Sequence, residues 1–143
     1  MKNKILVTTG DVNGIGAEVT IKALKARDCS DIILVSNRKV LDYYGGNDLA
    51  CEIIEIPFEG DIEPSMITKE SGEFSFQAVK KACELKPKAI VTAPISKEAI
   101  QLAGHNFSGH TEILEYYLAH NGQKAEMLFV AGNFRVLLLT RHC

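Results

Sequence analysis

Short runs of apolar, β-branched residues alternate with segments of helical periodicity along this chain, and this alternation limits the fold more than any other feature. Residues 5–9 form one strand-like run and residues 31–36 form a second. Between them, Ala17, Ile21 and Leu24 recur at the spacing of one helix face. Strands that alternate with helices predict an α/β domain whose mostly parallel sheet is covered on both faces.

The same alternation continues toward the C-terminus. Gly132-Asn133 between two apolar runs predicts a tight hairpin, and therefore an antiparallel pair of strands. Since no repeat or linker interrupts the pattern, we expect a single α/β region over residues 1–143. The other expected strands are residues 52–56, 88–92, 126–131 and 134–140; the other helices lie near 96–103, near 111–120, and around Phe76, Val79 and Cys83 after a turn at Ser71-Gly72.

Composition excludes several classes of partner. The 143 residues, 46% of them hydrophobic, suffice for one core, and a net charge of −2 gives no footprint for nucleic acid or an anionic membrane. Because no apolar run is long enough to cross a bilayer and no secretory leader is recognisable, we expect a cytoplasmic protein without membrane contact. The four cysteines lack C-x-x-C spacing, which favours free thiols over disulfides or a zinc site.

Residues 10–16 form a glycine-rich loop after the first strand, where phosphate and dinucleotide loops occur. Ala17-Glu18 stand where a Walker loop needs lysine and a hydroxyl residue, and Val19 stands where the Rossmann fingerprint needs a third small residue. Two interpretations stay open. Either the glycines permit close packing, or the loop lines a ligand site, with Asp11 and Asn13 as the candidate residues.

Residues 92–97 follow a buried strand at the edge where parallel-sheet enzymes bind ligands. Ser96 can cap the next helix. Lys97 would then start that helix, where the helix dipole disfavours a cation. An anionic ligand or a nearby carboxylate would explain its presence, so we consider Lys97 a candidate ligand-lining residue.

Gly109-His110-Thr111-Glu112 form a second loop-to-helix junction. With Thr111 as the expected N-cap, His110 has no structural task, and donors at a helix N-terminus suit a phosphate or hydroxyl ligand. His142 follows the apolar run 136–140 and is a candidate metal ligand, although one histidine does not make a site. We expect His105 and His120, in polar turn-like contexts, to be solvent-exposed.

Three ordered blocks resemble the 4-hydroxythreonine-4-phosphate dehydrogenase (PdxA) family of pyridoxal 5'-phosphate (vitamin B6) biosynthesis. They are residues 8–18, residues 92–112 with their Thr-Ala-Pro-Ile-Ser-Lys and Gly-His-Thr-Glu segments, and residues 140–142. The resemblance implies that His110 and Thr111 contact a phosphorylated substrate. It also implies that His142 is one of three histidines that hold a divalent metal ion.

The resemblance further implies an oxidoreductase that uses NAD or NADP to oxidise the secondary alcohol of 4-phosphohydroxy-L-threonine, followed by decarboxylation. A divalent ion (Zn, Mg or Co) would polarise the nascent carbonyl. The implied fold is the three-layer α/β/α architecture of the isocitrate and isopropylmalate dehydrogenases. The implied assembly is a homodimer with its active site near the subunit interface.

This chain departs from the family pattern at several positions and in length, so alternative functions stay open. Val12 and Ala17 replace prolines, and Arg141 stands where threonine is common. The match covers less than half of a typical member. Two further metal histidines, the later substrate-binding lysine, asparagine and arginine, and most of the nucleotide site are therefore expected after Cys143. No catalytic residue is assigned, and the fragment alone is expected to be inactive. A relative acting on 4-phospho-D-erythronate or a threonate phosphate, and a non-catalytic dimerisation module, remain the competing hypotheses.

Overall fold

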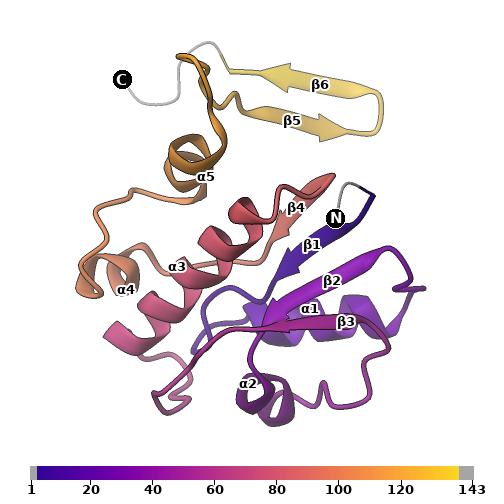
Figure 1. Cartoon of the computed structure of the whole chain (residues 1–143), viewed down its shortest axis with the longest axis vertical. Coiled ribbons are helices and arrows are strands. Elements are labelled where there is room, and N and C mark those ends of the chain that lie inside the picture. Colours follow the sequence, from indigo (N-terminus) through magenta and orange to yellow (C-terminus); the bar gives the residue numbers. More distant parts are fainter. Residues whose placement is uncertain (1–2, 139–143) are drawn as a thin grey trace.

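An open, parallel four-stranded sheet organises the protein (Figure 1). The computed structural model describes residues 3–138. The strand order is β3-β2-β1-β4, and each neighbouring pair is parallel. This confirms the predicted α/β class. The strands are β1 (Ile5–Thr8), β2 (Ile32–Ser36), β3 (Glu52–Glu55) and β4 (Ala89–Thr92); the helices are α1 (Gly16–Lys25), α2 (Arg38–Tyr43), α3 (Lys69–Glu84), α4 (Lys97–Leu102) and α5 (His110–Leu118).

Helices cover both faces of this sheet because successive strand residues point to opposite sides. On one face Leu6 and Ile33 contact the α3 side chain of Phe74. On the other face Val7 and Leu34 share a cluster with residues of α1, among them Ile21 and Leu24. The three layers expected from the sequence are therefore present. The helices α4 and α5 do not cover the sheet directly but pack on α3 through Phe76, Val79, Cys83, Ile100 and Ile113.

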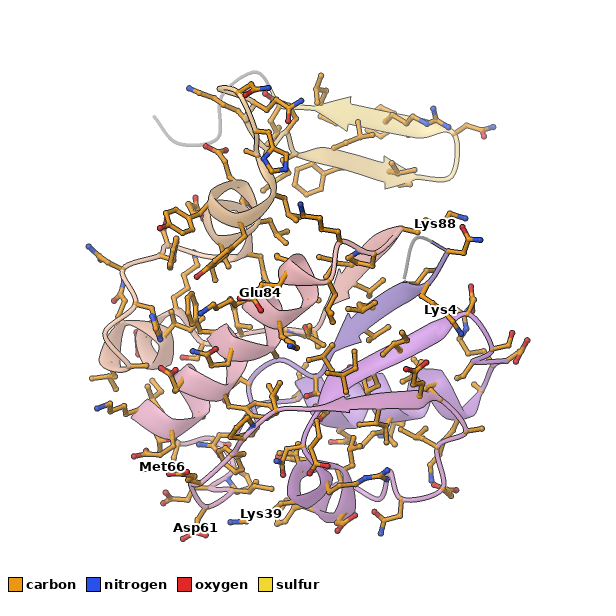
Figure 2. All side chains as sticks on the ribbon, in the orientation of Figure 1. Lys4, Lys39, Asp61, Met66, Glu84 and Lys88 are labelled. Atoms are coloured by element: carbon orange, nitrogen blue, oxygen red, sulfur yellow. The ribbon has the colours of Figure 1, made fainter. Side chains whose placement is uncertain are left out.

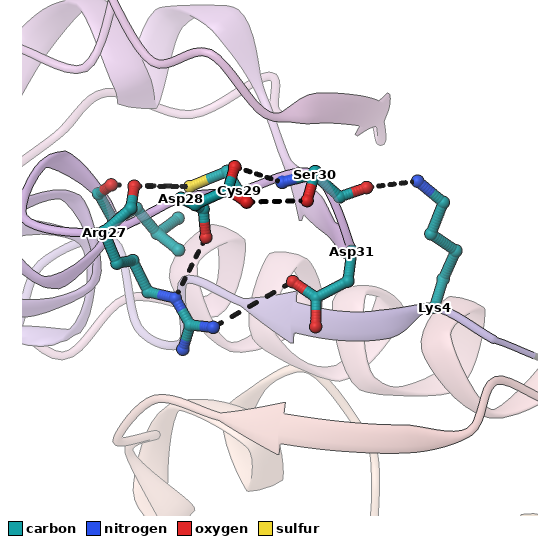
Figure 3. Close-up of polar contacts among 7 residues, drawn as sticks. Lys4, Arg27, Asp28, Cys29, Ser30 and Asp31 are labelled. Carbon is teal, nitrogen blue, oxygen red and sulfur yellow. Dashed lines mark hydrogen bonds and ion pairs between the residues drawn. The ribbon is translucent and has the colours of Figure 1, made fainter.

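The turn between α1 and β2 is fixed at the amino edge of the sheet, away from the strand ends that carry the predicted site (Figure 3). The Asp28 carboxylate accepts hydrogen bonds from the backbone N–H of Ser30 at 3.0 Å and from its hydroxyl at 2.8 Å. These bonds lower the pKa of Asp28. Lys4 Nζ donates to the carbonyl of Ser30 at 2.7 Å, which ties the entry of β1 to the entry of β2.

Two local predictions differ from the structure. The short helix α2 was not expected; it starts after Asn37, whose side chain accepts a hydrogen bond from the N–H of Lys39 at 2.9 Å. The predicted turn at Ser71-Gly72 was wrong, because both residues lie in the first turn of α3. Thr68 is the N-cap of this helix, and its hydroxyl accepts from the Ser71 N–H at 3.2 Å.

The expected hairpin is confirmed as an antiparallel pair, β5 (Leu128–Ala131) and β6 (Phe134–Leu137). Ala131 pairs with Phe134 across the turn, and Gly132 adopts a φ of 59° there. The pair forms a separate two-stranded sheet (Figure 1). The last residues of the expected strand 134–140 lie outside the described part of the chain.

The structure describes three of the four cysteines and tests the described helices for a membrane span. Cys29, Cys51 and Cys83 are buried free thiols. Burial raises the pKa of Cys83 to about 11, so that this thiol stays protonated at neutral pH. Within residues 3–138, no helix is both long and apolar enough to span a membrane.

Candidate functional site

The glycine-rich loop and residues 92–97 meet at the carboxyl ends of β1 and β4, because these strands are neighbours in the sheet. The N–H of Ala93 donates to the carbonyl of Thr8 at 3.2 Å. One step further, the N–H of Asp11 donates to the carbonyl of Pro94 at 2.9 Å. Two segments more than eighty residues apart in sequence thus form one surface at the edge where α/β proteins bind ligands.

The glycines of this loop let the backbones approach closely. Gly10 has a φ of +71°, and a Cβ at this position would lie 2.1 Å from the carbonyl oxygen of Pro94. A Cβ on Gly16 would lie 2.3 Å from the carbonyl oxygen of Thr9. Any larger residue would push the loop away from β4. These contacts favour the packing interpretation of the two glycines.

Asn13 is held entirely by protein groups. Its side-chain oxygen accepts from the N–H of Glu63 at 2.8 Å, and its Nδ2 donates to the carbonyl of Met66 at 3.0 Å and to the Thr68 hydroxyl at 3.2 Å. Its own N–H donates to a carboxylate oxygen of Asp11 at 3.0 Å. Asn13 is 3% exposed. Of the two candidate loop residues, Asn13 therefore fastens the loop to the segment before α3, whereas Asp11 stays half-buried at the surface.

Contacts from α2 and the residue after it hold the same region from the other side. Tyr44 donates its hydroxyl to the carbonyl of Val12 at 2.6 Å. Lys39 Nζ donates to the carbonyl of Gly60 at 2.7 Å and lies 3.1 Å from the carboxylate of Asp61 (Figure 2). The loop is therefore fixed by packing and hydrogen bonds on both flanks before any ligand binds.

Lys97 reaches from the start of α4 toward the second predicted junction. Ser96 caps α4 as expected, since its hydroxyl accepts from the N–H of Ala99 at 3.2 Å. A Cβ on Gly109 would lie 3.5 Å from Cε of Lys97 and 3.6 Å from a carboxylate oxygen of Glu112. The lysine and the carboxylate thus lie over the same backbone position. A nearby carboxylate was one of the two expected reasons for a lysine at this helix start.

The helix that carries His110 begins one residue earlier than predicted. The expected N-cap role of Thr111 was wrong, because α5 starts at His110 and Gly109 is the N-cap. Gly109 is extended and has no side chain to cap the helix. The first N–H groups of α5 therefore lack a side-chain acceptor from the cap position. Thr111 instead lies half-buried in the first turn.

His110 is the most unusual polar side chain of this region. Burial lowers its pKa, and a hydrogen bond with the backbone of Ala93 acts in the opposite direction without cancelling the shift. The ring is therefore neutral at pH 7. Its Nε2 is buried and has no hydrogen-bond partner among residues 3–138, and the same is true of the Thr8 hydroxyl at the end of β1. Unpaired buried polar atoms are costly, which makes this point a candidate binding position.

The remaining histidines divide into three cases. His120 is exposed, as predicted. The exposure predicted for His105 was wrong, because its ring stacks on Phe76 with centroids 3.6 Å apart and its Nε2 lies 2.6 Å from Glu73. His142 lies outside the described residues. Within residues 3–138 no three His, Cys, Asp or Glu side chains are grouped to hold a metal ion.

A hollow of about 670 Å³ lies elsewhere, between α3 and the segment after β3. None of the predicted site residues lines it. Its floor includes Ile56 and Phe74, and lysines and carboxylates mix along its rim. Mixed charge and the absence of a converging set of donors make it a weaker candidate than the junction around His110.

Comparisons with known proteins agree on one family. The family described as pyridoxal phosphate biosynthetic protein PdxA matches residues 2–143. A 4-hydroxythreonine-4-phosphate dehydrogenase of Campylobacter fetus is 34% identical over 97% of this chain, and a D-threonate 4-phosphate dehydrogenase of Cupriavidus necator is 30% identical over 95%. The chain spans 48% of each of these relatives, about half their length.

The structural comparison gives the same result. The crystal structure of a 4-hydroxythreonine-4-phosphate dehydrogenase from Klebsiella pneumoniae superposes with a TM-score of 0.81 at 25% identity, covering 96% of this chain and 49% of that one. A homologue from Burkholderia phymatum gives a TM-score of 0.80 at 27% identity over the whole chain and 51% of its own length. The chain belongs to the PdxA family of dehydrogenases and corresponds to the N-terminal portion of its members.

Proposed function

We propose that this chain supplies the phosphate-binding part of a dehydrogenase that oxidises 4-phosphohydroxy-L-threonine in pyridoxal 5'-phosphate biosynthesis. The observation that carries the proposal is His110 at the start of α5, a half-buried, neutral residue with a buried Nε2. Its ring is hydrogen-bonded to the backbone of Ala93 in the segment 92–97. Two segments of the family block 92–112 meet at this residue. The half-length match makes the activity of the whole enzyme part of the proposal.

Each residue of the junction would have a separate task in binding the phosphorylated end of the substrate. His110 donates the N–H of its neutral ring to the backbone of Ala93, so its free Nε2 would donate to the phosphate once the nearby anion favours the protonated ring. Thr111 would donate its hydroxyl from the first turn of α5. The backbone N–H groups at this helix N-terminus would donate to the same phosphate. Lys97 supplies a positive charge from the neighbouring helix start. Together these groups would orient the substrate and hold its charge.

NAD or NADP and a divalent metal ion belong to the same proposal through family membership. His142 would be one metal ligand, and the bound ion would polarise the alcohol oxygen. Residues 3–138 gather no set of three metal-ligating side chains, and the first loop packs its glycines against backbone carbonyls. The described residues therefore do not fit either group by themselves, and we derive no reaction step through them. We also propose that the whole enzyme is a homodimer in the cytoplasm.

The relatives support a second substrate. One relative is a D-threonate 4-phosphate dehydrogenase. The phosphate of this substrate would bind at the same place, the start of α5 beside residues 92–97. 4-Phospho-D-erythronate is a further hydroxy-acid phosphate of this class. The groups described above recognise the phosphate, not the carbon chain, so the preference proposed for 4-phosphohydroxy-L-threonine rests on family membership.

Calorimetric titration of the chain with 4-phosphohydroxy-L-threonine and with D-threonate 4-phosphate tests the proposal. We expect tighter binding of the first ligand, and about tenfold weaker binding after the substitution His110→Ala, since a buried hydrogen bond to a charged group is lost. Equal or reversed preference would contradict the first assignment, and a reversed preference would favour the second substrate. If neither ligand binds, the non-catalytic alternative replaces both.

A further inference from the structure

His105 is a partly buried histidine for which the proposed function gives no task. Its Nε2 lies 2.6 Å from a carboxylate oxygen of Glu73, and its ring stacks on Phe76 with an interplanar angle of 17°. Only 23% of its side chain is exposed. A short hydrogen bond and an aromatic stack fix the ring in two independent ways. The loop before α5 is therefore attached to α3 at this residue.

Glu73 is itself held in place for this contact. Its other carboxylate oxygen accepts a hydrogen bond from Gln77 at 2.7 Å, one helical turn along α3. Burial raises the pKa of Glu73, but the hydrogen bonds from Gln77 and His105 outweigh it and hold the pKa below its ordinary value. Glu73 is thus an ionised acceptor that points at His105 from a rigid helix.

The segment between His105 and α5 continues this attachment. The N–H of His105 donates to the carbonyl of Ile100 at 3.1 Å. The N–H of Phe107 donates to the carbonyl of His105 at 3.1 Å, and the Phe107 ring stacks on Phe76 with centroids 5.7 Å apart. Two residues later Gly109 caps α5 without a side chain. The direction in which α5 begins therefore depends on the residues just before it.

We propose that His105 is a positioning residue for the phosphate site. By joining Glu73 and Phe76 of α3 to the loop before α5, it sets where His110 and Thr111 lie relative to Ala93. The inference deepens the proposed function and rests on it only for the identity of the ligand. The geometry at the start of α5 is measurable without any ligand.

Three substitutions separate the two contacts. His105→Gln keeps a donor toward Glu73 but loses the ring, His105→Phe keeps the ring but loses the donor, and His105→Ala loses both. His120→Ala removes an exposed histidine and is the matched control. Each variant of the full 143-residue chain is studied by NMR, which reports the His110 ring signals and the exchange rates of the amides in β1 and α5.

We expect His105→Ala to raise amide exchange at Ile113 by about tenfold and to shift the His110 ring signals, while β1 amides keep their protection. The Gln and Phe variants should lie between the Ala variant and the wild type, and His120→Ala should match the wild type. Should His105→Ala fail to fold, the comparison of the Gln and Phe variants with the control decides the matter.

Unchanged His110 signals and unchanged α5 exchange in the His105 variants would overturn the inference. An equal loss of protection in β1 and α5 would overturn it too, since His105 would then only add to global stability. Binding of inorganic phosphate and of 4-phosphohydroxy-L-threonine separates this proposal from the previous one. If His110→Ala weakens binding and His105→Ala does not, the positioning role fails alone; if His105→Ala moves α5 but His110→Ala leaves binding unchanged, the proposed function fails alone.

Discussion

At the scale of single residues, the proposed phosphate site depends most on His110. Its ring is neutral because burial lowers its pKa, and one ring nitrogen is buried without a partner among the described residues. The hydrogen bond to the Ala93 backbone takes the one N–H of the neutral ring, so the buried Nε2 is an acceptor until the ring binds a further proton. Lys97 adds a positive charge nearby, over Gly109. The His110 ring has a fixed orientation and Lys97 carries a positive charge, and both properties suit a phosphate ligand.

The lowered pKa of His110 predicts a pH dependence of stability. Between its folded pKa and the ordinary value of 6.5, the unfolded chain binds more protons at this residue than the folded chain. The free energy of unfolding should therefore fall as the pH drops below about 6.5, and this loss should be absent in His110→Gln. Urea denaturation of both proteins between pH 5 and pH 8 measures the difference, with His120→Gln as the exposed control. A difference that stays constant over this range would contradict the assignment.

Lys97 and His110 were chosen from the sequence because a cation at a helix start and a histidine without a structural role are both unusual. The structure places both at the start of α5, and their part in binding stays a prediction. His105 was missed because its partner Glu73 is 32 residues away and nothing local indicates the contact. The N-cap role of Thr111 was wrong because the extended Gly109, two residues earlier, is the N-cap of α5.

At the scale of elements, the periodicity of the sequence predicted the four parallel strands and the hairpin. It did not predict the helix α2 or the helical conformation of Ser71 and Gly72. The helix α2 is six residues long, too short for a periodic pattern to stand out. Ser71-Gly72 looked like a turn because glycine usually interrupts helices. In the structure Gly72 lies where α3 crosses α4, and that long-range contact overrides the local propensity.

Gly72→Ala should therefore destabilise the protein although alanine favours helices. A Cβ at this position would lie 1.9 Å from the carbonyl oxygen of Ala99, so α3 and α4 would have to move apart. We expect the free energy of unfolding to fall by about 2–3 kcal/mol. Gly14→Ala is a suitable control, because its Cβ would meet Asp11 at an ordinary 3.6 Å. Equal effects of the two substitutions in urea denaturation would show that the helix crossing is not as tight as described.

At the scale of the whole molecule, apolar surface is distributed unevenly. The parallel sheet is covered on both faces, but β4 lies at its edge with Val91 exposed. The hairpin exposes apolar side chains on both of its faces, and a two-stranded ribbon alone is marginally stable in water. Its exposed apolar residues are Leu128, Phe129, Val130, Phe134 and Leu137.

We expect the isolated chain to associate with increasing concentration through this hairpin, because contiguous exposed apolar surface promotes association. Sedimentation velocity at several concentrations measures the effect. Phe129→Lys should reduce association, whereas Tyr43→Lys, which changes an exposed aromatic side chain on α2, should not. A chain that stays monomeric at every concentration, or that responds equally to both substitutions, would rule out the hairpin as the associating surface.

We propose that residues 92–97 and 109–112 together bind the phosphate of the substrate. The most direct test is a phosphorus NMR titration of 4-phosphohydroxy-L-threonine with the wild-type chain, with His110→Ala, and with His120→Ala as the control. We expect a saturable change in the phosphate signal for the wild type and the control, and binding about tenfold weaker for His110→Ala. Equal binding by all three proteins, or no change in the phosphate signal with any of them, would contradict this proposal.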